Sequence, residues 1–337
     1  MAVPLWVWAL TVAVVVGLLV VDFLGHVRTP HAPSLRESAW WSAAYIGVAV
    51  LFGLLVWWFG GGEPAGEYVA GYLTEKSLSL DNLFVFVLIM TGFAVPRALQ
   101  QKVLLFGIAV ALVLRTALIV AGAAALERFS WVFYLFGALL LWTAWVQARS
   151  GGHHDDQEFR ENAVLRLVRR VVPTTDDYAG DRLTTRVRGR RHLTPLAIAL
   201  VAIGSADVLF AVDSIPAIFG LTQDTFLVFA ANAFALLGLR QLYFLLDGLL
   251  DRLRYLAAGL AVILGFIGAK LVIHALHTNE LPFVNGGEPV TSVPEVPTWL
   301  SLAVIAGTLL VTTAASLAAD RRGRRAPVGA DQEDRRA

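Results

Sequence analysis

The chain has 337 residues, of which 57% are apolar and only 16% are charged, with a formal net charge of +1 and a mean hydropathy of +0.66. Soluble proteins carry roughly 25% charged residues, so this composition excludes a disordered chain and argues against a soluble enzyme. The chain contains no cysteine, which excludes disulfides, thiolate metal sites and cysteine nucleophiles.

Apolar runs long enough to cross a bilayer recur along nearly the whole chain. They predict an all-α polytopic membrane protein with about nine transmembrane helices. The predicted spans are 3–24, 39–60, 67–92, 102–126, 129–148, 195–218, 225–246, 255–276 and 299–318.

Basic loop residues orient these spans, because Lys and Arg concentrate on the cytoplasmic side of a membrane. With the N-terminus outside, every inside segment carries Arg or Lys, and ten Arg fall in 149–194 alone. Outside, Arg128 is the single basic residue, and the loop 277–298 carries acids without Lys or Arg. An odd number of spans then places the C-terminus inside.

The chain is expected to form one transmembrane domain. Its predicted parts are the domain 1–320 with core repeats 67–148 and 195–276, a cytoplasmic loop 149–194, and a disordered cytoplasmic tail 321–337. Within the loop, apolar and Arg residues mix over 159–172. This stretch is interpreted either as a helix lying on the inner leaflet or as a solvated basic linker.

Eight charged residues lie well inside the predicted spans, away from their ends, and each costs about 2.5–3.5 kcal/mol near the bilayer centre. They must therefore face the protein interior, pair with one another or bind an ion. These residues are Glu75, Lys76, Asp81, Arg115, Asp207, Asp213, Arg240 and Lys270.

The third and sixth spans share a pattern of two acids six residues apart with a polar residue after the second. The two sets are Glu75 and Asp81 with Asn82, and Asp207 and Asp213 with Ser214. In each set the next span carries Leu-Arg, at Arg115 and Arg240. Because the two spans run in opposite directions, spans 3–5 and 6–8 are interpreted as a 3+3 inverted repeat, typical of secondary transporters.

Carboxylates with an amide and a hydroxyl make an oxygen-rich site suited to Mn²⁺, Ca²⁺ or Mg²⁺. The candidate ligands are Glu75, Asp81, Asn82, Asp207, Asp213 and Ser214. Acids six apart on one helix differ by about 120° in azimuth. One regular helix therefore cannot aim both acids at one ion. Either Pro216 breaks the helix beside Asp213, or Asp81 and Asp213 meet across the repeat axis.

A second interpretation of the acids is structural. They could pair with the bases of neighbouring spans, which are Lys76, Arg115, Arg240 and Lys270. Such a site would be electrically balanced. An entering dication could then be compensated by the release of about two protons, which would make the protein an exchanger.

Three segments resemble the TerC family of integral membrane proteins. They are GYLTEKSLSLDNLFVF (71–86), DVLFAVDSIPAIFG (207–220) and ANAFALLGLRQLYFLL (231–246). The family takes its name from tellurium resistance, and the resemblance implies a Mn²⁺ exporter of the bacterial cytoplasmic membrane. Many members have Glu three positions before the first acid of the DxxFAxDS motif, whereas this chain has Gly204.

The function expected is therefore efflux of a hard divalent cation, with Mn²⁺ first among the candidates and protons as a candidate counter-ion. A membrane scaffold for stress-resistance or secretion partners is the alternative. Oxyanion transport is disfavoured, because four carboxylates would repel an anion. No nucleophile–base constellation, phosphate loop or HExxH motif is present, so no enzyme, resident cofactor or nucleic-acid partner is expected.

Overall fold

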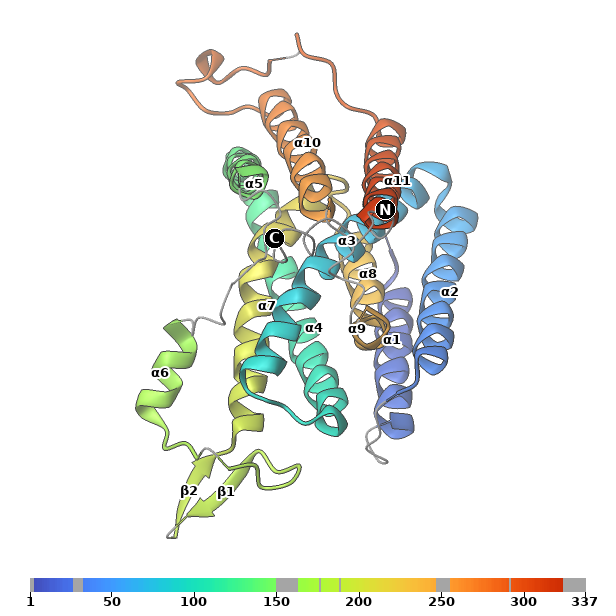
Figure 1. The fold of residues 1–337 in the computed structure, drawn as a ribbon. Coiled ribbons are helices and arrows are strands. Elements are labelled where there is room, and N and C mark those ends of the chain that lie inside the picture. Colours follow the sequence, from blue (N-terminus) through green and yellow to red (C-terminus); the bar gives the residue numbers. More distant parts are fainter. Residues whose placement is uncertain are drawn as a thin grey trace, which may run out of the picture.

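The computed structural model describes residues 3–26, 33–149, 163–175, 177–187, 189–246, 255–290 and 292–323. Long helices make up most of this part of the chain (Figure 1). They are α1 (Leu5–His26), α2 (Leu35–Gly60), α3 (Gly62–Gly92), α4 (Arg97–Arg128), α5 (Val132–Arg149), α7 (Pro195–Phe219), α8 (Thr225–Leu236), α9 (Leu239–Leu246), α10 (Leu256–His277) and α11 (Thr298–Gly323).

Each of the nine predicted spans coincides with a helix or, for 225–246, with the pair α8 and α9. Eight spans are long and apolar enough to cross a membrane by length and composition. The ninth, α3, has 31 residues, and its charged residues lower its hydropathy. It packs against α2, α7, α8 and α11. The prediction of an all-α polytopic membrane protein is confirmed, while the orientation and the inverted repeat stay predictions.

Burial separates a central group of helices from a peripheral one. In the α8–α9 span, 89% of the most apolar window is buried, whereas the corresponding shares are 17% for α1 and α2 and 11% for α11. The exposed side chains of these outer helices are large and apolar, including Leu10, Leu54 and Leu310. A surface of this kind is suited to lipid, so α3, α4, α7 and α8 form the protein interior.

The span 225–246 is broken between α8 and α9. Leu237 is extended and Gly238 has φ +80°, a conformation that favours glycine. A Cβ on Gly238 would lie 3.0 Å from Cβ of Tyr45 on α2. The break therefore rests on both backbone conformation and close helix packing.

The expected break at Pro216 is not seen. Helix α7 runs without interruption from Pro195 to Phe219, with Pro216 inside its last turn. The missing N–H of Pro216 costs one hydrogen bond to the carbonyl of Val212. Because the helix ends three residues later, few further bonds depend on that turn.

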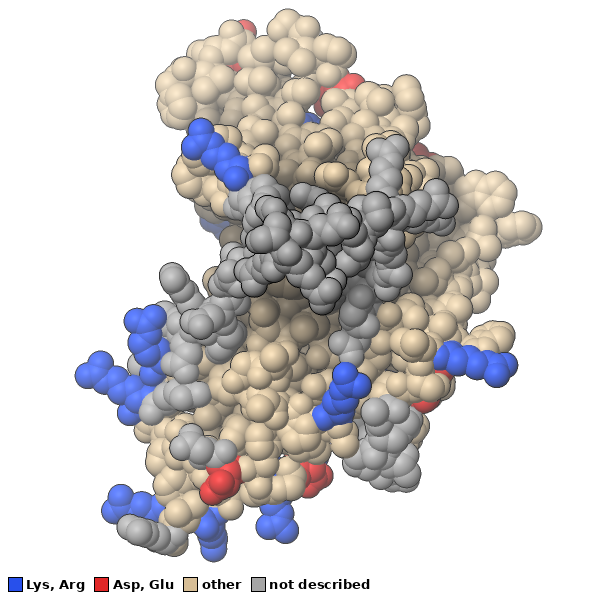
Figure 2. Space-filling model, viewed as in Figure 1, with Lys and Arg blue, Asp and Glu red and all other residues tan. Residues whose placement is uncertain are grey.

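The predicted cytoplasmic loop contains a short helix and a hairpin. Helix α6 (Ala163–Val171) covers part of the predicted amphipathic stretch, whose residues 159–162 lie outside the described ranges. Strands β1 (Thr184–Val187) and β2 (Arg190–Leu193) pair antiparallel, with Arg186 opposite Arg191. In Figure 2, most of the Lys and Arg visible on this face lie in its lower half, where α6 and the hairpin are found in Figure 1.

Several helices extend beyond the predicted spans; α4, for example, begins at Arg97, five residues before the predicted boundary. A short 3₁₀ turn, η2 (Asn285–Gly287), lies in the loop between α10 and α11. Helix α11 continues to Gly323, so its backbone includes the first residues of the predicted tail. The rest of that tail, 324–337, lies outside the part of the chain that the structure describes.

Candidate functional site

A buried arginine in the middle of α4 joins three helices. The Arg115 side chain is fully buried and forms a two-pronged ion pair with Asp207 of α7, with Nε 3.1 Å from Oδ2 and Nη2 2.9 Å from Oδ1. Its Nη1 donates to Oε1 of Glu75 on α3 and, at 3.4 Å, to Oγ of Ser214 on α7. The first acids of the two repeated motifs therefore meet on one guanidinium.

Asn82 completes this network. With its Oδ1 turned toward Arg115, it accepts from Nη2 at 3.2 Å, and its Nδ2 donates to the carbonyl of Leu78 at 3.1 Å. A guanidinium has five N–H donors in a fixed geometry. The four side chains around Arg115 use all five, because Asp207 takes two of them.

The network carries a surplus of negative charge. Glu75 and Asp207 contribute two charges and Arg115 neutralises one, which leaves a formal charge of −1 in a buried layer. Both acids are almost completely buried. Oε1 of Glu75 is bound to Arg115, but Oε2 has no hydrogen-bond partner among the described residues. Buried charge is stable only when it is paired and hydrogen-bonded, so this oxygen is the least satisfied atom of the pair.

Of the second acids of the two motifs, Asp213 is the one whose side chain the structure describes. Asp213 is half-buried on α7, about 120° around the helix from Asp207. Since α7 is unbroken, nothing rotates Asp213 toward Asp207. The backbone of Asp81 is helical, while its side chain lies outside what the structure describes.

Lys76 reaches the break in the α8–α9 span. Its Nζ donates to the carbonyl of Ala235 at 3.1 Å, in the last turn of α8. The carbonyl end of a helix carries partial negative charge and free acceptors. Lys76 therefore stabilises the end of α8 and is not bound to Glu75 or Asp207.

Arg240 belongs to a second buried network. Its Nη2 is 2.6 Å from Oδ1 of Asp22 on α1, and its Nη1 donates to Oε1 of Gln101 on α4 at 3.2 Å. The Nε2 of Gln241 also donates to Oδ1 of Asp22, at 2.9 Å. Arg240 thus neutralises an acid of the first helix, and its described contacts do not include Glu75 or Asp207.

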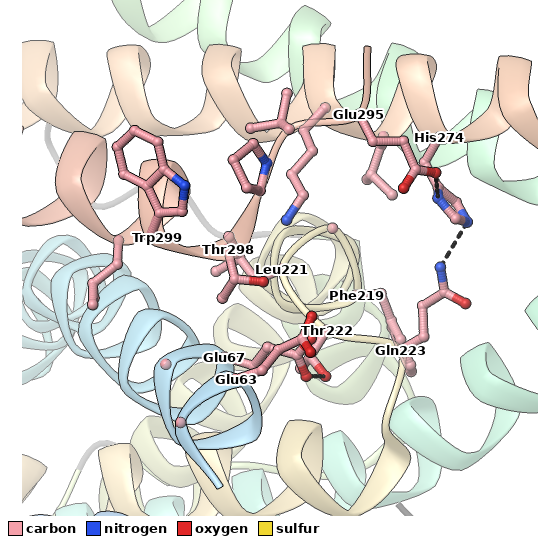
Figure 3. Close-up of a pocket in the computed structure, with 18 residues that line it drawn as sticks. Glu63, Glu67, Phe219, Leu221, Thr222, Gln223, His274, Glu295, Thr298 and Trp299 are labelled. Carbon is pink, nitrogen blue, oxygen red and sulfur yellow. Dashed lines mark hydrogen bonds and ion pairs between the residues drawn. The ribbon is translucent and has the colours of Figure 1, made fainter. Parts of the chain in front are cut away.

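Lys270 lies at the predicted outer end of the bundle. It donates to Oγ of Ser301 at 3.3 Å and lines a cavity of about 790 Å³, which Figure 3 shows. The cavity is also lined by Glu63 and Glu67 of α3 and by His274 of α10. The residues that line it do not include Arg115, Glu75 or Asp207, so the cavity does not bring Lys270 to that network.

Hydrogen bonds fix several of the polar groups around this cavity. Oγ1 of Thr222 donates to Oε2 of Glu67 at 2.6 Å, and Nε2 of Gln223 lies 2.7 Å from Nε2 of His274. The other ring nitrogen of His274 faces Glu295 at 3.8 Å (Figure 3). The described side chains include no group of three or more carboxylates and histidines that could hold a metal ion.

The comparisons with known proteins agree with this architecture. The model of the family "Integral membrane protein TerC family" matches residues 60–324. The chain belongs to the TerC family. An uncharacterized membrane protein of Mycobacterium tuberculosis is 56% identical over 312 residues, which cover 92% of this chain and 78% of the relative.

Two further relatives come from other bacteria. An uncharacterized membrane protein of Myxococcus xanthus is 40% identical over 93% of this chain and 92% of its own length. The putative membrane-bound redox modulator Alx of Escherichia coli is 37% identical over 90% of this chain and 92% of its own length. No solved structure matches the chain. Every residue of the Arg115 network lies within residues 60–324, the range that the family model matches.

Two functional features were missed by the sequence prediction. Asp22 lies near the end of α1 and carries the partner charge of Arg240, yet an acid at a span end is easily interpreted as a loop residue. The outer cavity is formed by side chains from α3, α7, α10 and the segment before α11. Only the lateral arrangement of the helices brings these segments together.

Proposed function

We propose that this TerC family protein exports a hard divalent cation, Mn²⁺ first among the candidates, from the cytosol across the bacterial cytoplasmic membrane in exchange for protons. The observation that carries the proposal is the meeting of Glu75 and Asp207 on Arg115. Ionisable groups buried within spans are costly and typically mark ion pathways. Here they come from two helices of opposite predicted direction, as in transporters with inverted repeats.

The charge of the network is suited to a cation. Arg115 balances one carboxylate, so a dication that binds Glu75 and Asp207 must compete with the guanidinium for their oxygens. Oε2 of Glu75 is already available on the side that Arg115 does not use. Carboxylate, amide and hydroxyl oxygens from Glu75, Asn82 and Ser214 are ligands that Mn²⁺, Ca²⁺ and Mg²⁺ accept.

Proton exchange follows from electroneutrality. A dication adds two positive charges to a layer where uncompensated charge is expensive. Glu75 and Asp207 are ionised when paired with Arg115, so in the exchange they would take up protons only after the metal leaves; Asp213 and Asp81 are further candidates to carry them. We expect about two protons for each metal ion, from the charge balance alone.

The proposal is tested by reconstituting the purified full chain in liposomes that contain a pH dye and a Mn²⁺ indicator. Wild-type protein should move Mn²⁺ and protons in opposite directions, and Asp207→Asn should abolish both fluxes. Asp181→Asn is the matched control, because Asp181 is an exposed carboxylate that is paired with Lys102. Absence of Mn²⁺, Ca²⁺ and Mg²⁺ flux from a folded wild-type preparation would overturn the proposal.

A membrane scaffold remains the second candidate, and one observation favours it. All five donors of Arg115 are occupied, so the network also fits a purely structural clasp between α3, α4 and α7. The Escherichia coli relative is named a putative redox modulator, but this chain contains no cysteine for thiol–disulfide exchange. Replacing Asp81 and Asp213 separates the two candidates, because a scaffold should tolerate the change and a transporter should lose its flux.

A further inference from the structure

An asparagine in α8 is buried without hydrogen bonds. Asn232 is 1% exposed, and neither Oδ1 nor Nδ2 has a partner among the residues that the structure describes. The large majority of buried side-chain polar atoms are hydrogen-bonded, so each exception needs a physical explanation. The surrounding run, ANAFALL, is otherwise apolar.

The packing of α8 places Asn232 in the same layer as Arg115. One turn before Asn232, Val228 belongs to a buried cluster with Ile119 of α4 and Ile218 of α7. Helices α4 and α7 run parallel, since Gly107 faces Ile203 and Gly122 faces Phe219.

Helix α8 follows α7 after a short loop and runs back in the opposite direction (Figure 1). One helical turn from the cluster, forward along α8 and backward along α4 and α7, therefore lie Asn232, Arg115 and Ser214. The last two are already joined at 3.4 Å. Asn232 is four residues after Val228 and therefore lies on the same face of α8.

Helix α3 closes the same layer from another side. A Cβ on Gly71 would lie 3.3 Å from Cβ of Ala231, and Lys76 bonds the carbonyl of Ala235. The segment with Thr74 and Glu75 therefore runs alongside the turn that contains Asn232. Oγ1 of Thr74 and Oε2 of Glu75 are buried and also lack partners in the described part of the chain.

We propose that Asn232 is a metal ligand of this site, with its Oδ1 and Oε2 of Glu75 binding a hard divalent cation between α3 and α8. The inference rests on the proposed function and adds a fourth helix to the site. A neutral amide oxygen suits a cation of this class, because it ligates without adding to the buried negative charge. Carboxylates alone would leave more charge to neutralise when the cation departs.

The experiment titrates Mn²⁺ alone into the purified full chain and follows the thermal unfolding midpoint, with liposome flux as a second readout. Asn232→Leu removes both polar atoms at similar volume, whereas Asn232→Asp keeps the oxygen. Ser42→Ala is the matched control. It removes a buried hydroxyl that, like the Asn232 amide, has no described partner. Ser42 lies on α2, which contributes no side chain to the Arg115 network.

Asn232→Leu should weaken the apparent Mn²⁺ affinity by about tenfold or more, as loss of a group around a metal does. Its midpoint without metal should stay equal or rise, because an unpaired buried amide is gone. Asn232→Asp should retain binding, and Ser42→Ala should match wild type. A structural asparagine would instead lower the metal-free midpoint in Asn232→Leu.

Equal Mn²⁺ affinity in Asn232→Leu and wild type would overturn the inference and assign the amide to a buried water. If Asn232→Leu does not fold, Asn232→Ser decides, because its shorter side chain withdraws the oxygen and should also weaken binding; wild-type affinity in that variant would reject the ligand role. No binding or flux of Mn²⁺, Ca²⁺ or Mg²⁺ in wild type would remove the proposed function as well. The two failures are therefore distinguishable.

Discussion

Two buried arginines of this protein have corresponding places in the sequence and different surroundings in the structure. Arg115 holds two carboxylates, from α3 and α7, and its network has a formal charge of −1. Arg240 forms its described ion pair with one carboxylate, Asp22 of α1, which also accepts from the amide of Gln241. The comparison shows that a buried arginine alone does not mark an ion site. The meeting of two carboxylates on one base distinguishes the network that can attract a cation.

The largest expected effect is the loss of Arg115. In Arg115→Met, Glu75 and Asp207 stay buried without their partner, and breaking a buried pair in this way costs about 3–5 kcal/mol. Thermal unfolding of the purified protein should show a large fall in midpoint. The same substitution combined with Glu75→Gln and Asp207→Asn should recover most of it, because no buried charge is then left alone.

Arg240→Met is the parallel variant for the second network. Asp22 would keep the amide of Gln241 as a donor at 2.9 Å, so its destabilisation should be smaller than that of Arg115→Met. An equal or greater loss in Arg240→Met would contradict the difference drawn between the two networks.

Neutralising Asp22 tests the comparison from the other side. Asp22→Asn keeps the shape of the side chain and removes the ion pair with Arg240. A hydrogen bond to a charged group contributes about 1.5–3 kcal/mol, so the unfolding midpoint should fall. Mn²⁺ flux per folded molecule should nevertheless match wild type, because Asp22 is not among the described partners of Arg115. Lost flux in a folded Asp22→Asn preparation would give α1 a role in transport.

The break between α8 and α9 should be sensitive to a single methyl group. Gly238→Ala forces a non-glycine residue to φ +80° and brings its Cβ to 3.0 Å from Tyr45. The left-handed conformation alone costs about 1–2 kcal/mol, so the midpoint should fall. Gly47→Ala is the control, since a Cβ added at Gly47, in the middle of α2, would have no neighbouring atom within 4 Å. That variant should be neutral or stabilising by about 0.5–1 kcal/mol. Similar midpoints for both variants would show that the break does not need glycine.

The sequence predicted the spans well because each depends on a local property. An apolar run of about 20 residues must be helical wherever it crosses a bilayer, since its backbone groups have no other partners there. The cost of buried charge likewise predicted that Glu75 and Asp207 would face the interior. It left their partners open, because partner choice depends on which helices are neighbours.

Tertiary packing accounts for what the sequence left out. Pro216 is the stronger local signal for a break, yet the break occurs at Gly238, where α2 approaches closely. Asn232 had a signal, a polar residue in an apolar span, but its importance depends on the absence of a described partner. The hairpin β1–β2 was missed because its strands have only four residues each and carry arginines instead of alternating apolar residues.

The smallest expected effect concerns the hairpin region, which lies outside the spans. Oδ2 of Asp181 is 2.8 Å from Nζ of Lys102 at the start of α4, and this hydrogen bond lowers the pKa of Asp181. A carboxyl whose pKa is lower in the folded state stabilises the fold above its unfolded pKa, and that contribution disappears as the pH falls through the folded value. Amide hydrogen exchange of residues 177–187 should therefore be slightly slower in wild type than in Asp181→Asn at neutral pH. At acidic pH this difference should disappear.

The reason for the small size is exposure, since ion pairs of exposed side chains contribute little in water and less in salt. Asp181→Asn should also leave Mn²⁺ flux unchanged, in contrast to Asp207→Asn. Both substitutions remove a carboxylate that is paired with a base, but Asp181 is exposed whereas Asp207 is buried. Equal effects of the two on flux would mean that burial does not distinguish the Arg115 network. The comparison between the Arg115 and Arg240 networks would then lose its physical basis, because it also depends on the cost of charge in an apolar interior.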